Sequence, residues 1–437
     1  MKPKSYRTQH QVVYILSLLA FLFFNPCLSF SQEEKTVPDG TEGEVLNIPS
    51  ADTAEVKKKN LAWNEFDLKF TTIKFGAAVL VDYATFSQDE EGEAQMDSLN
   101  ASLVSKFKVR DFRVLVGGRF NTKRTITWKA GIIYDGATDT WRFRETGFTI
   151  GVPELSSHVF IGRTKEGFSF NKVMSGYAVW GFERQMSLDV IPILADGIKW
   201  FGFLPKSRIF WNTGIYADWL SEGQGFSKFN WQFAARVGWM PVYNTSSNTL
   251  LHIGASYRYG EPLNGTMRLR SKPEADIAPY YVDTGNFDSE HSNHVGGEIY
   301  YSRGPLMLGS EVFLHSFQSI QAGDPTFSGG EIVATYILTG ESRPYSTVGS
   351  VYSFVPVDDP LFKGGAGAWE AVLRFTWFDL DGGTVSGGKF WRITPMINWY
   401  MNKALRMEFG YGYGVLDRFN LNGATHFFQS RIQIFIN

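Results

Sequence analysis

The stretch that decides the fold of this chain runs Phe229-Asn230-Trp231-Gln232-Phe233-Ala234-Ala235-Arg236-Val237-Gly238-Trp239. Apolar residues, most of them bulky, occupy every second position, and polar or small residues lie between them. Successive side chains of a strand point to opposite faces, so this segment has one hydrophobic and one polar face. A soluble sandwich also alternates, but it buries its hydrophobic face and seldom repeats aromatic residues this often. A transmembrane barrel turns the hydrophobic face to lipid and the polar face to its lumen, which makes the lumen a candidate conduit.

The composition agrees with an all-β transmembrane antiparallel barrel. The chain has 437 residues, of which 16% are aromatic and 43% hydrophobic, and its mean hydropathy is slightly negative at -0.16. This excludes a helical membrane protein and suits a barrel, because alternation dilutes the hydrophobic signal. Length alone would suggest two or three soluble domains. A closed barrel escapes that expectation because it uses many residues in one unit.

The N-terminus has the pattern of a signal peptide. Basic residues precede an apolar run over 12–24, which is too short for a good membrane-spanning helix. Ser29 and Ser31 are small residues at the positions that signal peptidase reads, so we expect a signal peptide over 1–31. Its removal takes three basic residues from 42 and leaves 39 against 44 acidic residues, a net charge of -5. The one cysteine, Cys27, leaves with it, which excludes disulfides and thiolate chemistry.

Two further domains follow. Residues 32–60 are polar and poor in aromatic residues, which predicts a disordered periplasmic leader. Residues 61–437 are expected to form the barrel. Its seventeen candidate strands are 68–84, 110–120, 124–135, 140–151, 156–163, 197–203, 208–219, 228–241, 249–260, 266–283, 292–302, 306–318, 327–339, 367–380, 390–402, 404–416 and 424–436. Because barrels of this kind have an even number of strands, we expect some candidates to merge or fail and sixteen strands to form.

Minimal turns alternate with long connections, as expected when one end of a barrel faces a confined space. Residues 303–305 form a minimal connection, whereas 164–196 and 340–366 are long. A loop of about thirty residues is unusual in a compact domain and is usually functional. We expect 164–196 to fold inward and narrow the pore. The alternative is an external loop whose charges meet lipid head groups.

Several motifs in series carry a resemblance to a known family. They are Ile161-Gly-Arg-Thr-Lys-Glu-Gly-Phe168, Phe182-Glu-Arg184, Thr335-Tyr-Ile-Leu-Thr-Gly-Glu-Ser-Arg-Pro-Tyr345, Gly365-Ala-Gly-Ala-Trp-Glu-Ala-Val-Leu-Arg374 and Asn398-Trp-Tyr-Met-Asn402. In order and spacing they resemble the phosphate-selective porin O and P family, from about residue 60 to the C-terminus. The resemblance implies a sixteen-stranded barrel in the bacterial outer membrane, a homotrimer, and passive diffusion of anions such as phosphate.

Alternation also assigns charged residues to the lumen. The inward basic residues are Lys74, Arg113, Arg119, Lys129, Arg142, Arg144, Lys228, Arg236, Arg258, Arg374, Arg392, Arg406 and Arg431, and the inward acidic ones are Asp82, Asp111, Asp218, Glu298, Glu311, Glu331, Glu370 and Glu408. Thirteen against eight makes the lumen positively biased, which favours anions. Arginine also offers a planar fork for phosphate oxygens. The alternative is that these are wall residues held in cross-strand ion pairs.

The residues expected to set selectivity come from the inward loop and the wall. They are Lys165, Lys172 and Arg184 in the loop, supported by Arg142, Arg144, Arg374 and Arg392 on the wall. A second set, Arg268, Arg270 and Lys272, is expected near a barrel mouth.

Competing functions remain open. They are a non-specific general porin, a barrel-embedded outer-membrane enzyme such as a lipase or protease, and an adhesin or structural barrel. We see no Ser–His arrangement that supports an enzyme, so we expect none. The Asp379-Leu-Asp381-Gly-Gly stretch lacks the other ligands of a calcium loop, and His291 with His294 lacks a carboxylate partner, so we expect no metal or cofactor. Basic residues are spread along the chain, which does not support nucleic-acid binding.

Overall fold

The computed structural model describes residues 61–135, 139–218 and 229–437. The predicted signal peptide (1–31) and leader (32–60) lie outside the described residues. Within the part described, no helix has the length and apolar character needed to cross a membrane.

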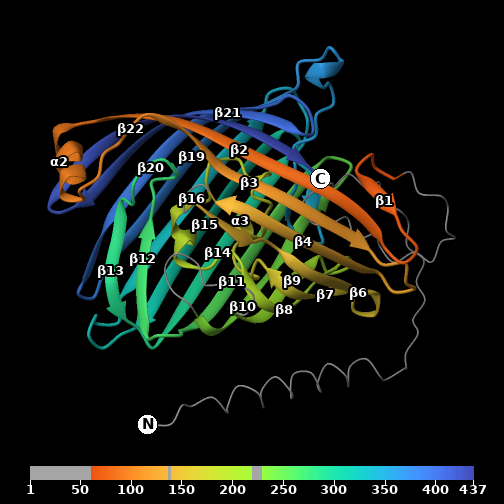
Figure 1. Ribbon diagram of the computed structural model, residues 1–437, viewed down its shortest axis with the longest axis horizontal. Coiled ribbons are helices and arrows are strands. Elements are labelled where there is room, and N and C mark those ends of the chain that lie inside the picture. The colour runs from red at the N-terminus through yellow and green to blue at the C-terminus, as the bar shows by residue number, and fades with distance from the viewer. Residues whose placement is uncertain (1–60, 136–138, 219–228) are drawn as a thin grey trace, which may run out of the picture. The chain divides into compact units, whose positions relative to one another are not determined.

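Sixteen strands of the described residues close into an antiparallel barrel (Figure 1). They are β2 (Thr72–Gln88), β3 (Lys106–Arg119), β4 (Ile126–Asp135), β5 with β6 (Thr140–Phe143 and Thr146–Val152), β7 (Ser157–Thr164), β8 (Ala195–Leu204), β9 (Ile209–Ala217), β10 (Phe229–Asn244), β11 (Thr249–Pro262), β14 (His291–Arg303), β15 (Leu306–Gln318), β16 (Thr326–Ile337), β19 (Ala368–Gly382), β20 (Val385–Tyr400), β21 (Leu405–Arg418) and β22 (Leu421–Ile436). Both β5 and β6 pair with β4, so they count as one interrupted strand. The barrel closes where β22 pairs with β2, with Asp82 opposite Arg431. The predicted all-β barrel is confirmed.

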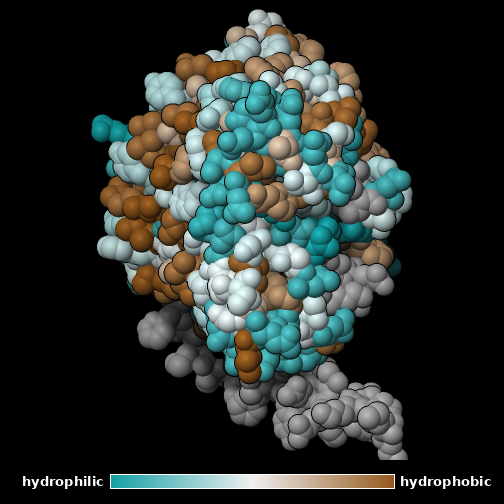
Figure 2. Space-filling model, turned by 90° about the vertical axis from the view of Figure 1, so that its left-hand side faces the viewer, coloured by the Kyte–Doolittle hydropathy of each residue, from teal (hydrophilic) through white to brown (hydrophobic). Residues whose placement is uncertain are grey.

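The remaining elements lie in the connections. They are β1 (Glu65–Asp67), α2 (Glu90–Ser98), η1 (Pro153–Leu155), α3 (Phe170–Val173), η2 (Met186–Val190), β12 (Thr266–Ser271), β13 (Val282–Asp288), β17 (Tyr345–Ser346), β18 (Val351–Tyr352) and η3 (Leu361–Lys363). Figure 1 shows α2 and the β12–β13 hairpin at one end of the barrel, which we call the loop end. The other end, the turn end, carries β1 and the C-terminus. Figure 2 looks onto the loop end, where hydrophilic residues gather, while hydrophobic residues lie on the flank.

The faces of the strands follow the predicted alternation. On β21, Arg406 and Glu408 are buried in the lumen, whereas Phe409 is 43% exposed on the outside. On β10, Arg236 is likewise buried and Val237 faces outward. For Phe229 the predicted outward orientation was wrong. A register shift after this residue turns its ring into the lumen. Charge falls on the inner face because a basic side chain at the lipid midplane costs about 2–4 kcal/mol.

One predicted wall strand was wrong. Residues 266–283 do not join the wall but pair as β12 with β13 in a separate hairpin, which packs its apolar side chains inward. The physical reason is that Pro273 and Pro279 interrupt the segment, and proline has no N–H to donate to a ladder.

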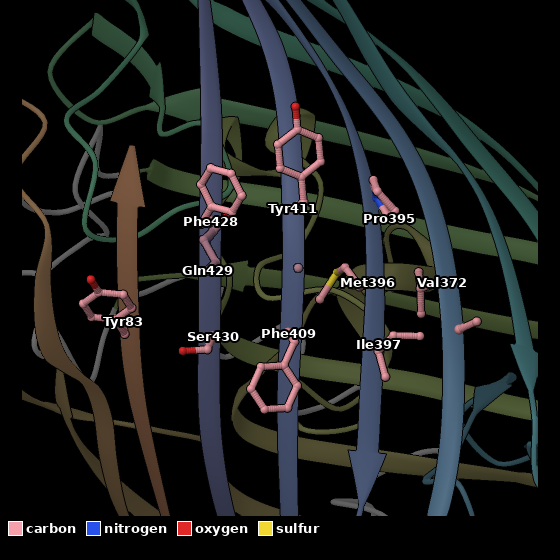
Figure 3. Close-up of a pocket in the computed structure, with 12 residues that line it drawn as sticks. Tyr83, Val372, Pro395, Met396, Ile397, Phe409, Tyr411, Phe428, Gln429 and Ser430 are labelled. Carbon is pink, nitrogen blue, oxygen red and sulfur yellow. The ribbon is translucent and has the colours of Figure 1, made fainter. Parts of the chain in front are cut away.

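The outer wall has an apolar groove of about 640 Å³ over β19 to β22 and β2 (Figure 3). Phe409, Tyr411 and Phe428 stand along it. Pairing of β20 with β21 lapses at Pro395, between Ile393 and Met396. The groove lies on the outer, lipid-facing side, so it is not part of a path through the lumen.

Candidate functional site

The loop between β7 and β8, residues 165–194, folds into the lumen as the sequence predicts. We call it the inward loop. Phe168, Phe170, Met174 and Trp180 of this loop are fully buried. Its short helix α3 lies within the barrel in Figure 1.

A wall carboxylate anchors the start of α3. Glu311 on β15 accepts hydrogen bonds from the backbone N–H groups of Phe170 (2.6 Å) and Asn171 (3.1 Å) and from the Ser169 hydroxyl (3.1 Å). The Gln185 amide donates to the same carboxylate at 2.9 Å. A buried acceptor thus satisfies N–H groups at the beginning of the helix, which would otherwise be unpaired.

Wall side chains also hold the second half of the inward loop through its backbone carbonyls. Gln433 donates to Tyr177 (3.0 Å), Arg406 to Val179 (2.8 Å), Asn398 to Trp180 (3.0 Å), Arg431 to Phe182 and Arg374 to Glu183 (2.9 Å). Carbonyls cut off from water must be paired, so these donors stabilise one position of the loop. The inward loop and the wall approach each other closely at Gly410, where a Cβ atom would lie 2.6 Å from the Phe182 ring.

A cavity of about 350 Å³ remains between the inward loop, the strands β2 to β7 and the β12–β13 hairpin. Among the described residues its basic lining consists of Arg110, Arg113, Arg142, Arg144, Arg163, Arg184, Arg270, Lys272 and Arg431, and its acidic lining of Asp111, Glu183, Asp189, Glu274 and Asp276. A smaller cavity of about 50 Å³ lies toward the turn end, beside Lys74 and Lys129. Arg113 and Arg144 line both cavities, which indicates one eccentric path along this side of the barrel.

Ion pairs compensate part of this positive charge. Glu183 pairs with both Arg110 and Arg431, each at 2.8 Å. Burial would raise the pKa of Glu183, but Arg110 and Arg431 outweigh burial and lower that pKa to about 2. Arg113 pairs with Asp111 at 2.9 Å. Nine basic against five acidic groups of the described lining still leave an excess of four positive charges when all are ionised.

Three of the seven predicted site residues line this cavity. Arg142 and Arg144 come from the wall at β5 and β6, and Arg184 comes from the inward loop. The Arg184 guanidinium also donates to the carbonyls of Asn171 (2.9 Å) and Met174 (2.8 Å). Arg184 therefore both faces the cavity and ties its loop together.

Lys165 and Lys172, the two predicted lysines, are buried within the inward loop. Neither is among the described residues that line the cavity. Lys172 is 1% exposed and pairs with Glu166 at 2.7 Å, and Arg258 completes the cluster at 3.0 Å from the same carboxylate. Burial lowers the pKa of Lys172 to about 8, although Glu166 opposes this effect. Lys165 donates to the Met174 carbonyl at 2.8 Å.

The two remaining wall arginines are also held in buried contacts. Arg374 pairs with Glu331 at 2.7 Å and with Glu274 at 3.1 Å. Arg392 donates to the Pro273 carbonyl at 2.6 Å and to the Gln429 side chain at 2.5 Å. Other inward arginines follow the ion-pair alternative, as in Arg236–Glu298, Arg406–Glu408 and Arg431–Asp82. Lys228, also predicted inward, lies outside the described residues.

Sequence reasoning missed four basic residues of the cavity. Arg110 is the extra residue of a bulge, because Leu80 pairs with Asp111 and Val81 with Val109, so strict alternation could not find it. Arg270 and Lys272 were expected near a mouth, and they line the cavity because their segment folds as the hairpin. Arg163 was visible in the Ile161–Phe168 motif, and it pairs with Asp196 at 3.1 Å.

Two histidines of the lumen contact each other, and a third, His252, contacts the Glu298 carboxylate at 2.7 Å. His294 contacts His315 through their Nδ1 atoms at 2.8 Å and the Ser292 hydroxyl at 3.0 Å. Within the described residues, no group of three or more His, Cys, Asp or Glu side chains could hold a metal ion.

A closed β-barrel with an apolar outer wall, a charged lumen and a constricting inward loop is the architecture of an outer-membrane porin. The chain belongs to the phosphate-selective porin O and P family, which matches residues 100–433. The family and the fold place it in the bacterial outer membrane and indicate a channel rather than a barrel-embedded enzyme.

Solved porins and outer-membrane channels share the fold at low sequence identity. An anion-selective porin from Comamonas acidovorans matches with a TM-score of 0.55 and 10% identity, over 84% of this chain and 99% of that one. The outer-membrane channel DcaP of Acinetobacter baumannii matches with a TM-score of 0.53 and 9% identity, over 85% and 99%. An uncharacterised protein of Caulobacter vibrioides is 30% identical over 181 residues, which are 40% of this chain and 35% of the relative. The chain thus aligns with only about a third of that relative's length.

Proposed function

We propose that this porin carries small anions by passive diffusion, with phosphate and polyphosphate as candidate solutes, along the eccentric basic cavity. The observation that carries the proposal is the excess of basic over acidic groups among the described lining residues, in a mature chain whose predicted net charge is negative. Charged rings in a narrow passage select by sign, because their field acts at close range and is poorly screened there.

The proposal divides the predicted site residues into two roles. Arg142, Arg144 and Arg184 would meet the solute, because they line the cavity. Guanidinium groups can bind two phosphate oxygens at once, which suits a phosphate-like solute. The other four predicted residues, Lys165, Lys172, Arg374 and Arg392, would act indirectly by stabilising the packing around the path.

The assembly and export of the protein are part of the same proposal. We infer a homotrimer embedded in outer-membrane lipid; a fold relative, OmpT of Vibrio cholerae, is described in a trimer form and matches with a TM-score of 0.51 and 9% identity over 84% of this chain. We also infer that residues 1–31 are cleaved as a signal peptide and that 32–60 remain as a periplasmic leader. Intact mass of the purified protein, and its mass in native detergent complexes, test both inferences.

Reversal potentials in planar bilayers test the proposed function. In a potassium chloride gradient an anion-preferring pore gives a potential displaced toward the chloride equilibrium value. Added phosphate should then reduce the chloride current by competing for the same arginines. A general porin is the competing function, and it predicts equal permeation and no competition. Absence of any conductance from well-inserted protein would exclude a porin.

A further inference from the structure

Apolar as well as basic side chains line the cavity of about 350 Å³. Four of the apolar ones belong to the last part of the inward loop, and an aromatic ring joins them from the segment between β12 and β13. They are Leu188, Ile191, Ile193, Leu194 and Tyr280. An inorganic anion makes its favourable contacts with charged and polar groups, so a passage for such anions alone needs no apolar surface.

Two of these apolar residues present accessible surface. Leu188 and Ile191 also belong to the core cluster that includes the β12–β13 hairpin, and they are 5% and 2% exposed. Ile193 and Tyr280, in contrast, are half-buried, and neither belongs to a core cluster of the described residues. Core packing therefore accounts for Leu188 and Ile191, whereas Ile193 and Tyr280 keep surface that a solute in the cavity can cover.

The Tyr280 ring lies against two cationic side chains. The centre of the ring is 4.1 Å from the Arg270 guanidinium and 5.7 Å from the Lys272 ammonium group. Cations at such distances over an aromatic face are attracted by the quadrupole of the ring. Arg270 and Lys272 line the same cavity. An aromatic surface and two positive charges thus occur together on one short stretch of the chain.

Guanidinium groups reach the cavity from the wall and from the inward loop. Arg142 of β5, Arg144 directly after β5, and Arg184 of the loop are all half-buried and line it. A forked guanidinium binds both oxygens of a carboxylate as it binds those of a phosphate. The charged group of an organic anion can therefore be held by these arginines while the body of the same molecule covers Ile193 and Tyr280.

We propose that the path favours organic anions whose charged group is attached to an apolar or aromatic body, with aromatic monocarboxylates as the model class. Sites of about 300–1,000 Å³ that bind small organic molecules combine apolar and aromatic side chains with a few placed polar groups. The cavity has this mixed lining. Covering its apolar surface releases water, and this adds to the attraction by the arginines. The inference rests on the proposed function in requiring a conducting path through this cavity, and it adds the chemical class of the solute.

Inhibition of the chloride current by added carboxylates tests this preference. Benzoate and gluconate are the probes, because both carry one negative charge at neutral pH. Benzoate has an apolar ring, whereas gluconate has a polyhydroxyl chain of at least the same bulk. In single-channel recordings benzoate should halve the chloride current at about one tenth of the gluconate concentration. A tenfold ratio corresponds to about 1.4 kcal/mol, which burial of about 55 Å² of apolar surface supplies.

Substitution of Ile193 by threonine assigns the effect to the cavity. Threonine keeps the branched shape of the side chain but has less apolar surface, so I193T should raise the half-inhibiting benzoate concentration about threefold. The value for gluconate should not change. Ile320→Thr is the matched control, because Ile320 is 84% exposed in the connection between β15 and β16. Tyr280→Ser is a second variant, which removes the aromatic ring and leaves the inward loop unaltered.

The outcomes separate this inference from the proposed function. A benzoate preference that falls in I193T or Y280S supports the inference, even if reversal potentials show no general anion preference, which would overturn the proposed function alone. Equal inhibition by benzoate and gluconate overturns the inference, and the proposed function stands when phosphate still competes with chloride. A benzoate preference unchanged in both variants also overturns it, because the apolar contacts would then lie elsewhere. If no added anion reduces the current and no anion preference is measured, both proposals fall.

Discussion

Replacing Arg144 by glutamine should weaken anion preference more than any equal change of charge at the surface. Arg144 follows β5 at the point where the fourth strand of the wall is interrupted, and it lines both cavities of the eccentric path. An ion that passes from one cavity to the other must therefore pass this guanidinium.

The magnitude follows from Coulomb's law. Two unit charges about 4 Å apart interact by about 1 kcal/mol at the dielectric constant of water, and by more where water is excluded. Loss of about 1 kcal/mol of attraction changes a permeability ratio roughly fivefold. Arg144→Gln should therefore lower the chloride-to-potassium permeability ratio by about fivefold. Lys206→Gln, an exposed residue of the β8–β9 turn, should change the ratio much less, because salt screens a surface charge within about 8–10 Å.

The assay is the reversal potential of single variants in the same salt gradient. Heat-modifiable mobility on gels first establishes that each variant is folded. Equal shifts in Arg144→Gln and Lys206→Gln would refute the reasoning, because position along the path would then have no effect. An unchanged ratio in both would show that the solute does not pass Arg144.

Two further predictions concern the inward loop. Lys172→Met should destabilise the barrel by about 1–3 kcal/mol in urea unfolding, since the buried Glu166 loses one of its two cationic partners while Arg258 still pairs with it; an unaltered midpoint would show that the Lys172 pair is not needed. Asp189 lines the cavity, and its burial, with the negative charge of Glu183 adding to it, raises its pKa to about 7. Below that pH Asp189 is neutral and the cavity carries one more net positive charge, so anion preference should be stronger at pH 6 than at pH 8; Asp189→Asn should abolish the pH dependence, and a dependence that persists in this variant would exclude Asp189 as its cause.

Much of the barrel could be predicted because its determinants are local. The alternation on β21, with Arg406 inward and Phe409 outward, needs only the two-residue period of a strand. The inward loop could also be predicted, because a loop of about thirty residues is unusual in a compact domain. The false wall strand at 266–283 alternates correctly, and the prolines within it were the signal against it.

The candidate site could be predicted only in part, because its chemistry depends on partners from distant strands. The sequence predicts Lys172 as a residue of the pore constriction, but in the fold it is buried in a cluster with Glu166 and Arg258. The sequence predicts that Arg374 contributes to anion selectivity, yet in the structure its guanidinium donates a hydrogen bond to the Glu183 carbonyl of the inward loop. Which charges remain on a pore surface is decided by packing across the lumen.

The sequence by itself determined the membrane-barrel class and the inner and outer faces of the strands, and it predicted a positive bias of the lumen, because each depends on periodicity and charge along the chain. The tertiary structure alone decided where that bias acts. Closure of β22 on β2, the bulge at Arg110 and the entry of the inward loop into the lumen bring residues hundreds of positions apart into contact. Ion pairing and burial arise from those contacts, so the proposed path of the solute can be traced only in the closed barrel.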